Sequence, residues 1–127
     1  MGKSNGTDAL LLYQLHFDGI TNTFHFKSNS ATVDLTSTTV AVANRWYHVA
    51  ATYNAAGLVS TLYIDGVSEA TGLAGAAQPA VANPMRVGGR GANYFNGQVD
   101  EVRIWNTVRS GAQINANMFT QIGRAHV

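Results

Sequence analysis

Residues 58–71 read LVSTLYIDGVSEAT, and this stretch carries the strongest local structural signal in the chain. Between Leu58 and Ile64 the side chains alternate between two sets of positions. Leu58, Leu62 and Ile64 belong to one set, and Val59, Thr61 and Tyr63 belong to the other. This is the two-residue period of a β-strand. Asp65-Gly66 then supplies the residues that a tight two-residue turn requires, and a second strand-like run follows at residues 67–71. The stretch therefore predicts an antiparallel β-hairpin.

Further runs of strand length lie on both sides of this hairpin, with turn residues between them. They cover residues 11–17, 23–27, 31–36, 46–53, 85–87 and 98–105. The run at 46–53 is apolar on both faces, so we expect a central strand that is covered on both sides. Ser110 and Gln113 match a capping box, which predicts a short helix carrying Ile114 and Met118 on one face. Repeated short strands with turns between them favour an antiparallel sandwich or barrel.

Composition excludes several classes of protein. The 127 residues are enough for one domain, and the net charge of +1, with no basic run, argues against nucleic-acid binding. Because no apolar stretch approaches the roughly 20 residues of a membrane helix, we expect no membrane insertion. The chain has 0 cysteines, which excludes disulfides but leaves the cellular compartment undetermined.

Three segments in order resemble a known family. They read RWYHVAATY at residues 45–53, LYIDG at 62–66 and FNGQVDEVRIWN at 95–106. Their order and spacing are similar to those of laminin G-like jelly-roll domains of the concanavalin A-like lectin/glucanase superfamily. The resemblance covers roughly residues 8–119. It implies an all-β fold, an antiparallel β-sandwich (jelly roll) with one short C-terminal helix.

The same resemblance predicts an incomplete domain that is truncated at both ends. Members of the family usually have further strands before the one expected near Leu10 and another strand after the helix. The last residues, IGRAHV at 122–127, match the translation of a common sequencing adapter. We therefore interpret residues 122–127 as a non-native tail and residues 1–121 as the laminin G-like domain.

The superfamily includes glucanases, so the acidic residues were tested for catalysis. A glycosidase needs two carboxyl groups on one face, about 5–9.5 Å apart depending on the mechanism. Asp100 and Glu101 are adjacent, so a strand would direct them to opposite faces, and Glu101 could instead pair with Arg103. There is also no Gly-x-Ser-x-Gly elbow for a nucleophile. The sequence thus predicts that the chain is not an enzyme and has no catalytic residues.

The histidines and the glycine-rich loop leave metal binding undetermined. Asp18-Gly19, between the runs at 11–17 and 23–27, predicts a first hairpin, and His16 and His25 could approach each other across it. A metal there would need Asp18 as well, and His48 is interpreted as a structural sheet residue. The family resemblance raises Ca²⁺, but the loop at 88–96 contains no Asp or Glu. We expect no cofactor in this fragment, whereas Ca²⁺ binding by the full-length domain stays open.

Arg90, Asn93 and Tyr94 are the candidate ligand-binding residues. Sugars are bound by flat aromatic faces together with planar hydrogen-bonding groups, and these three side chains offer both. The alternative is that residues 88–93 form a plain connecting loop. Trp46 and Trp105 lie within apolar runs, so they are expected in the core rather than as sugar platforms.

The function predicted from this reasoning is a non-catalytic carbohydrate-binding or adhesive module of a larger secreted or surface protein. Its partner would be a glycan or a surface protein, and its location extracellular or at the cell surface. This expectation rests on the family resemblance, because a fold alone does not determine function. Two alternatives remain: a fragment of a glycan-processing enzyme of the same superfamily, and a structural or protein–protein spacer module.

Overall fold

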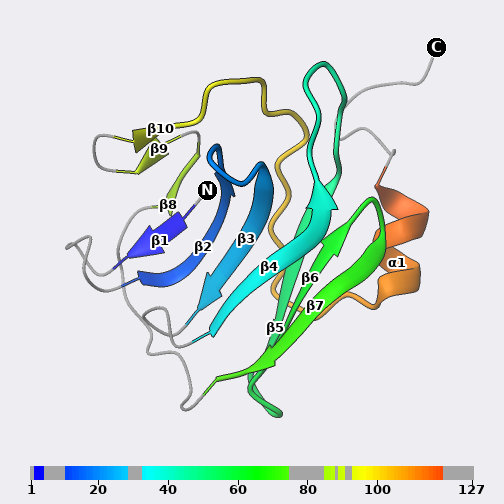
Figure 1. Cartoon of the computed structure of the whole chain (residues 1–127). Helices are drawn as coiled ribbons and strands as arrows, with labels where there is room; N and C mark the ends of the chain where they lie inside the picture. Colours follow the sequence, from blue (N-terminus) through cyan, green and yellow to red (C-terminus); the bar gives the residue numbers. More distant parts are fainter. Residues whose placement is uncertain are drawn as a thin grey trace.

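A computed structural model describes residues 2–4, 11–28, 33–74, 85–87, 89–90 and 93–118. Its strands form a five-stranded sheet in the order β4-β3-β2-β1-β8, a three-stranded sheet in the order β5-β6-β7, and the short pair β10-β9. All pairings are antiparallel (Figure 1). The elements are β1 Gly2–Ser4, β2 Leu11–Asp18, β3 Thr23–Ser28, β4 Val33–Val40, β5 Val49–Asn54, β6 Val59–Ile64, β7 Val67–Leu73, β8 Met85–Arg86, β9 Gly89–Arg90, β10 Asn93–Tyr94 and α1 Gly111–Asn117.

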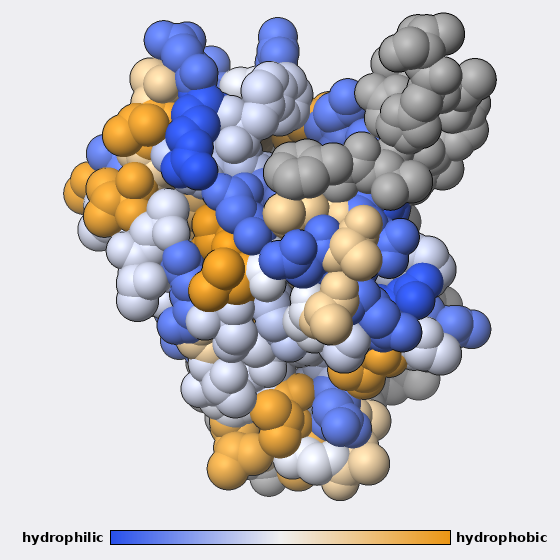
Figure 2. All heavy atoms as spheres, turned by 90° about the vertical axis from the view of Figure 1, so that its right-hand side faces the viewer, coloured by the Kyte–Doolittle hydropathy of each residue, from blue (hydrophilic) through white to orange (hydrophobic). Residues whose placement is uncertain are grey.

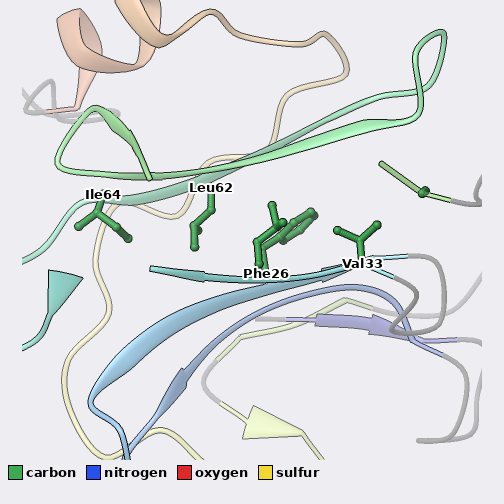
Figure 3. Packing of buried hydrophobic residues seen from close by; sticks show 6 residues of the cluster. Phe26, Val33, Leu62 and Ile64 are labelled. Carbon is green, nitrogen blue, oxygen red and sulfur yellow. The ribbon is translucent and has the colours of Figure 1, made fainter. Parts of the chain in front are cut away.

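The core lies between the five-stranded and the three-stranded sheets. Alternation along the strands turns Phe26 and Val33 of the larger sheet towards Leu62 and Ile64 of the smaller one (Figure 3). Leu62 is completely buried, with 0% of its surface exposed. The predicted antiparallel β-sandwich is therefore confirmed.

Two polar contacts also connect the sheets. The hydroxyl groups of Ser28 in β3 and Ser60 in β6 lie 3.1 Å apart, and both side chains are fully buried. Glu69 of β7 accepts hydrogen bonds from the backbone N–H and the hydroxyl of Thr39 in β4. Because buried hydroxyl and carboxyl groups are costly without partners, these contacts favour one relative position of the sheets.

The predicted hairpin at residues 58–71 is confirmed as β6 and β7. Asp65 and Gly66 have φ angles of 49° and 78°, the left-handed backbone that the tight turn needs. The carboxylate of Asp65 also accepts a hydrogen bond of 2.9 Å from the backbone N–H of His48, while Arg45 Nη2 lies 3.0 Å from its second oxygen. The turn thus holds the chain that enters β5.

The prediction of a central strand at residues 46–53 is wrong in two respects. The observed strand begins only at Val49, and within the described residues β5 has β6 as its neighbour and lies at the edge of its sheet. Residues 45–48 are held by the β6–β7 turn through Asp65 instead of by a second neighbouring strand.

The predicted strand at residues 98–105 is also wrong. The chain between β10 and α1 carries no strand (Figure 1). Glu101 in this segment has a left-handed φ of 52°. A strand needs a neighbour to satisfy its backbone N–H and C=O groups, and no described strand lies in register with these residues. Conversely, β1 is a strand that the sequence analysis did not predict; it pairs with β2 and β8.

The helix α1 is confirmed together with its cap. Ser110 Oγ accepts from the backbone N–H of Gln113 at 3.2 Å, and Gln113 Oε1 accepts from the backbone N–H of Ser110 at 3.0 Å. Ile114 is the buried residue of this helix. No helix among the described residues is long and apolar enough to cross a membrane. The predicted tail at residues 122–127 lies outside the described residues.

Candidate functional site

The short hairpin β9–β10 carries the three predicted ligand-binding residues. Arg90 faces Asn93 across the strand pair, and Tyr94 faces Gly89. The Tyr94 side chain is 79% exposed, whereas the side chains of Arg90 and Asn93 lie outside the described residues. The structure therefore places one exposed aromatic ring at this hairpin and brings the backbones of Arg90 and Asn93 side by side.

The residue after β10 anchors this hairpin to the sandwich. Phe95 packs edge-on against Phe17 at the end of β2, with ring centroids 6.3 Å apart. Phe17 in turn contacts Phe24 of β3 at 5.3 Å. A β-carbon on Gly97 would come within 2.8 Å of the Phe95 ring, so the absent side chain at this position makes room for that ring. Tyr94 thus extends from an aromatic cluster at one end of the large sheet.

The expectation that both tryptophans lie in the core is wrong. Trp46 is 63% and Trp105 53% exposed. Trp46 lies in the loop before β5, and Trp105 lies in the segment between β10 and α1 that forms no strand, so neither belongs to a described sheet. The Arg109 guanidinium carbon lies 3.6 Å from the centre of the Trp105 ring, a cation–π contact that covers part of it. Both indoles are therefore additional exposed aromatic surfaces, although their apolar neighbours in the sequence predicted that they would be buried.

The outer face of the five-stranded sheet is polar and contains the two hairpin histidines. His16 of β2 and His25 of β3 face each other in the strand pair, and their rings are stacked with centroids 4.9 Å apart and an angle of 12°. His25 Nδ1 lies 3.2 Å from both Asp34 Oδ1 and Thr36 Oγ1 on β4, and Lys27 Nζ lies 3.6 Å from Asp34 Oδ2. The two histidines therefore lie next to each other across the hairpin, as the sequence allowed.

This arrangement does not fit the three-ligand metal site that the sequence analysis left open. Ring lone pairs lie in the ring planes, so nearly parallel stacked rings do not direct them at one point. Asp18 accepts a hydrogen bond of 2.8 Å from the backbone N–H of Ile20 in the turn. No group of three or more His, Asp and Glu side chains in the described part of the chain could hold a metal ion.

The described carboxylates all have structural partners. Asp34 pairs with His25 and Lys27, Asp65 with Arg45 and His48, and Glu69 with Thr39. Asp100 accepts a 2.8 Å hydrogen bond from the backbone N–H of the next residue. The predicted pairing of Glu101 with Arg103 is confirmed, with 3.8 Å between Oε2 and Nη2.

The pKa values of two carboxyl groups also argue against general-acid catalysis. Burial raises the pKa of Glu69, but hydrogen bonds from Thr39 and Thr38 outweigh this effect and lower it below its usual value. The hydrogen bond from the Ile20 backbone lowers the pKa of Asp18. A general acid at a glycosidic bond needs a raised pKa, so neither group suits that role.

His48 takes a structural position, although it precedes β5 rather than lying within a strand. Its backbone N–H donates to Asp65, and its carbonyl oxygen accepts from the Asp65 N–H at 2.8 Å. Burial lowers the pKa of its imidazole, and the nearby Arg103 lowers it further against the raising effect of Asp65. The imidazole ring is therefore neutral at pH 7. The backbone N–H and carbonyl groups of His48 hold the β6–β7 turn.

Lowering the pH should destabilise the fold through His16. Burial, the stacked His25 and the nearby Lys27 lower the pKa of His16 from 6.5 to about 4. Between these two values the unfolded chain binds a proton that the folded chain excludes, so the free energy of unfolding falls as the pH falls from 6.5 towards 4. For a half-exposed ring we expect a loss of ~1–2 kcal/mol after allowance for solvent screening.

Urea unfolding at several pH values across this range checks the expectation. His48 and the carboxylates also titrate in the folded or unfolded chain, so the informative quantity is the difference between the wild type and His16→Gln. The variant should show a flatter dependence of stability on pH. Equal slopes for the two proteins would contradict a role for His16.

Comparisons with known proteins agree with this fold. The family model described as the concanavalin A-like lectin/glucanases superfamily matches residues 2–115. One solved structure with a similar fold is an S-layer domain-containing protein (residues 221–444) from Clostridium thermocellum, with 19% identity and a TM-score of 0.57. The match covers 84% of this chain and 63% of that chain. No curated protein gives a match.

The family match extends over nearly the whole sandwich, from β1 to the helix. It includes the segments at 45–53, 62–66 and 95–106 on which the sequence resemblance depends. The two facing antiparallel sheets and the capped helix are the architecture that the resemblance implies. The chain therefore belongs to the laminin G-like family of the concanavalin A-like lectin/glucanases superfamily.

Proposed function

We propose that this chain is a non-catalytic carbohydrate-binding or adhesive module of a larger secreted or surface protein. The observation that carries the proposal is the hairpin β9–β10, where the exposed ring of Tyr94 stands beside the paired backbones of Arg90 and Asn93. An exposed aromatic ring offers a flat face for the C–H groups of a sugar, and guanidinium and amide groups donate in the planar geometry that sugar hydroxyls accept.

The partners of the carboxylates support the non-catalytic part of the proposal. Hydrolysis of a glycosidic bond requires two free carboxyl groups around one cavity, and the described carboxylates are engaged in holding turns and strands together. A surface location is supported by the family and by the S-layer domain-containing protein of similar fold, although that likeness concerns the fold alone.

Replacing the Tyr94 ring should abolish most glycan binding. We expect Tyr94→Ala to weaken the affinity for a bound polysaccharide by about fivefold, since one stacked ring contributes on the order of 1 kcal/mol. Tyr94→Phe keeps the ring and should retain most of the affinity. The measurement is an array of neutral plant and bacterial cell-wall polysaccharides, followed by calorimetric titration with the polysaccharide that binds.

Leu73→Ala is the matched control, because Leu73 is an exposed large side chain at the far end of the smaller sheet (Figure 1). It should leave binding unchanged. Binding that survives Tyr94→Ala would remove the hairpin from the proposal, and a wild type that binds no polysaccharide would favour the spacer module. Release of reducing sugar from any of the polysaccharides would contradict the non-catalytic assignment.

A further inference from the structure

Asn96 and Gly97 follow the β9–β10 hairpin and form a pair with a chemistry of its own. Apolar side chains on the face shown in Figure 2, by contrast, lie in separate patches among polar ones, which is ordinary for a protein surface. Asparagine is thermolabile, and it loses its side-chain amide most readily before glycine, which has no side chain to obstruct the reaction. The sequence contains this pair twice, at Asn5-Gly6 and at Asn96-Gly97, and the second lies within the described residues. Asn96 is therefore the asparagine of the described chain at which deamidation is expected first.

The structure leaves the Asn96 amide open to this reaction. Residues 94–100 are exposed, and neither Asn96 nor Gly97 belongs to a strand or a helix. No hydrogen bond joins the Asn96 amide to another described residue. Asn54 differs in this respect, because its Oδ1 accepts a hydrogen bond of 3.1 Å from the backbone N–H of Ala56. Since no ladder of hydrogen bonds fixes the backbone at residues 96–97, the Gly97 nitrogen can approach the side-chain carbon of Asn96.

We propose that Asn96 deamidates spontaneously in the folded protein and that the isoaspartate product releases Phe95 from its packing site. The Gly97 nitrogen, deprotonated by hydroxide, attacks the side-chain carbonyl carbon of Asn96. The new C–N bond closes a five-membered succinimide, and ammonia leaves with a proton taken from water. Water then adds to one of the two ring carbonyl carbons and breaks its bond to the Gly97 nitrogen, which gives aspartate or isoaspartate. This inference is independent of the glycan-binding proposal.

The packing of Phe95 depends on the backbone that this reaction changes. The Phe95 ring lies so close to Gly97 that a β-carbon there would come within 2.8 Å of it, and the same ring packs edge-on against Phe17 at 6.3 Å. In isoaspartate the chain runs through the side-chain methylene group, so an extra backbone atom separates Phe95 from Gly97. The ring then loses its spacing from both neighbours, and the hairpin loses its anchor. Aspartate keeps the original backbone path and should preserve this packing.

Peptide mapping by mass spectrometry of the full chain, incubated at mildly alkaline pH, tests the reaction itself. The peptide with Asn96 should gain one mass unit, faster as the pH rises, and fragment ions assign the gain to that residue. Asn54 is the internal control, because it is exposed but precedes Ala55 and is hydrogen-bonded; Asn96 should convert at least several-fold faster. Asn96→Gln should abolish the gain at this position. Conversion that needs urea, or that is no faster than at Asn54, would overturn the proposal.

Hydrogen exchange of the separated isoaspartate form tests the structural consequence. The amide groups of β9–β10 should exchange several-fold faster than in the unmodified chain, while those of β6 in the core should keep their protection. Asn96→Asp is the matched control, because it adds the same carboxylate without lengthening the backbone, and it should exchange like the wild type. Gly97→Ala should loosen the hairpin as isoaspartate does, since its β-carbon displaces the Phe95 ring. Equal exchange in the isoaspartate form and Asn96→Asp would overturn the effect on Phe95.

Discussion

Replacing Leu62 by alanine is expected to lower the free energy of unfolding by about 3–4 kcal/mol, the largest effect of any single change proposed for this chain. Leu62 lies at the centre of β6, has 0% of its surface exposed, and packs between the two sheets (Figure 3). Truncation removes buried methyl groups and leaves a cavity that two hydrogen-bonded sheets cannot readily close. Because whole domains are stable by only about 5–15 kcal/mol, the variant should lose a large share of its stability.

The measurement is urea unfolding followed by the intrinsic fluorescence of Trp46 and Trp105 and by circular dichroism. Leu73→Ala in β7 is the matched control, because it makes the same chemical change on a side chain that is 73% exposed. It should change the free energy of unfolding by less than about 0.5 kcal/mol. Similar losses in the two variants would mean that the space between the sheets does not hold the main core.

Replacing Gly66 by alanine is expected to lower the free energy of unfolding by about 2–3 kcal/mol, through two separate causes. The φ angle of 78° is a left-handed conformation that a β-carbon disfavours. In addition, that β-carbon would come within 2.8 Å of Asn115 Nδ2 and 3.1 Å of the Asn115 α-carbon in α1. The backbone of the helix would have to move, so we expect α1 to detach from the turn.

Gly19→Ala is the control for this substitution. Gly19 lies in the turn between β2 and β3, and a β-carbon there would meet nothing within 4 Å. Its stability should change by less than about 1 kcal/mol. Hydrogen exchange of the α1 amide groups separates the two causes, because detachment of the helix should speed their exchange in Gly66→Ala even under conditions where the sheets remain folded. Unchanged protection of α1 would remove the steric part of the explanation.

The candidate site was only partly accessible to sequence reasoning. The combination of an aromatic ring with guanidinium and amide groups identified Tyr94, Arg90 and Asn93, and the structure exposes Tyr94 and pairs the other two positions in β9–β10. The exposure of Trp46 and Trp105 was missed, because apolar neighbours in the sequence suggest burial whether or not a second layer covers them. Nothing in the neighbouring sequence indicates that these two tryptophans lie outside the strands.

The sequence by itself determined the elements whose causes are local. The two-residue period and the Asp65-Gly66 turn predicted β6 and β7, Asp18-Gly19 predicted the first hairpin, and Ser110 with Gln113 predicted the helix cap. In these elements the decisive interactions join residues close along the chain, such as turn conformations and capping hydrogen bonds. Because the alternating strands each carry apolar side chains on one face, the sequence also implied two layers that enclose an apolar interior.

Only the tertiary structure decided which strand-like runs obtain neighbours. Residues 98–105 alternate as clearly as β6 does, yet they form no strand, whereas the unpredicted β1 does because β2 and β8 lie on either side of it. The stacking of His16 on His25 likewise depends on the register between two strands. Alternation in the sequence predicts which way each side chain points. The backbone hydrogen bonds of a strand, however, are made with another strand, and whether that strand is present depends on the whole fold.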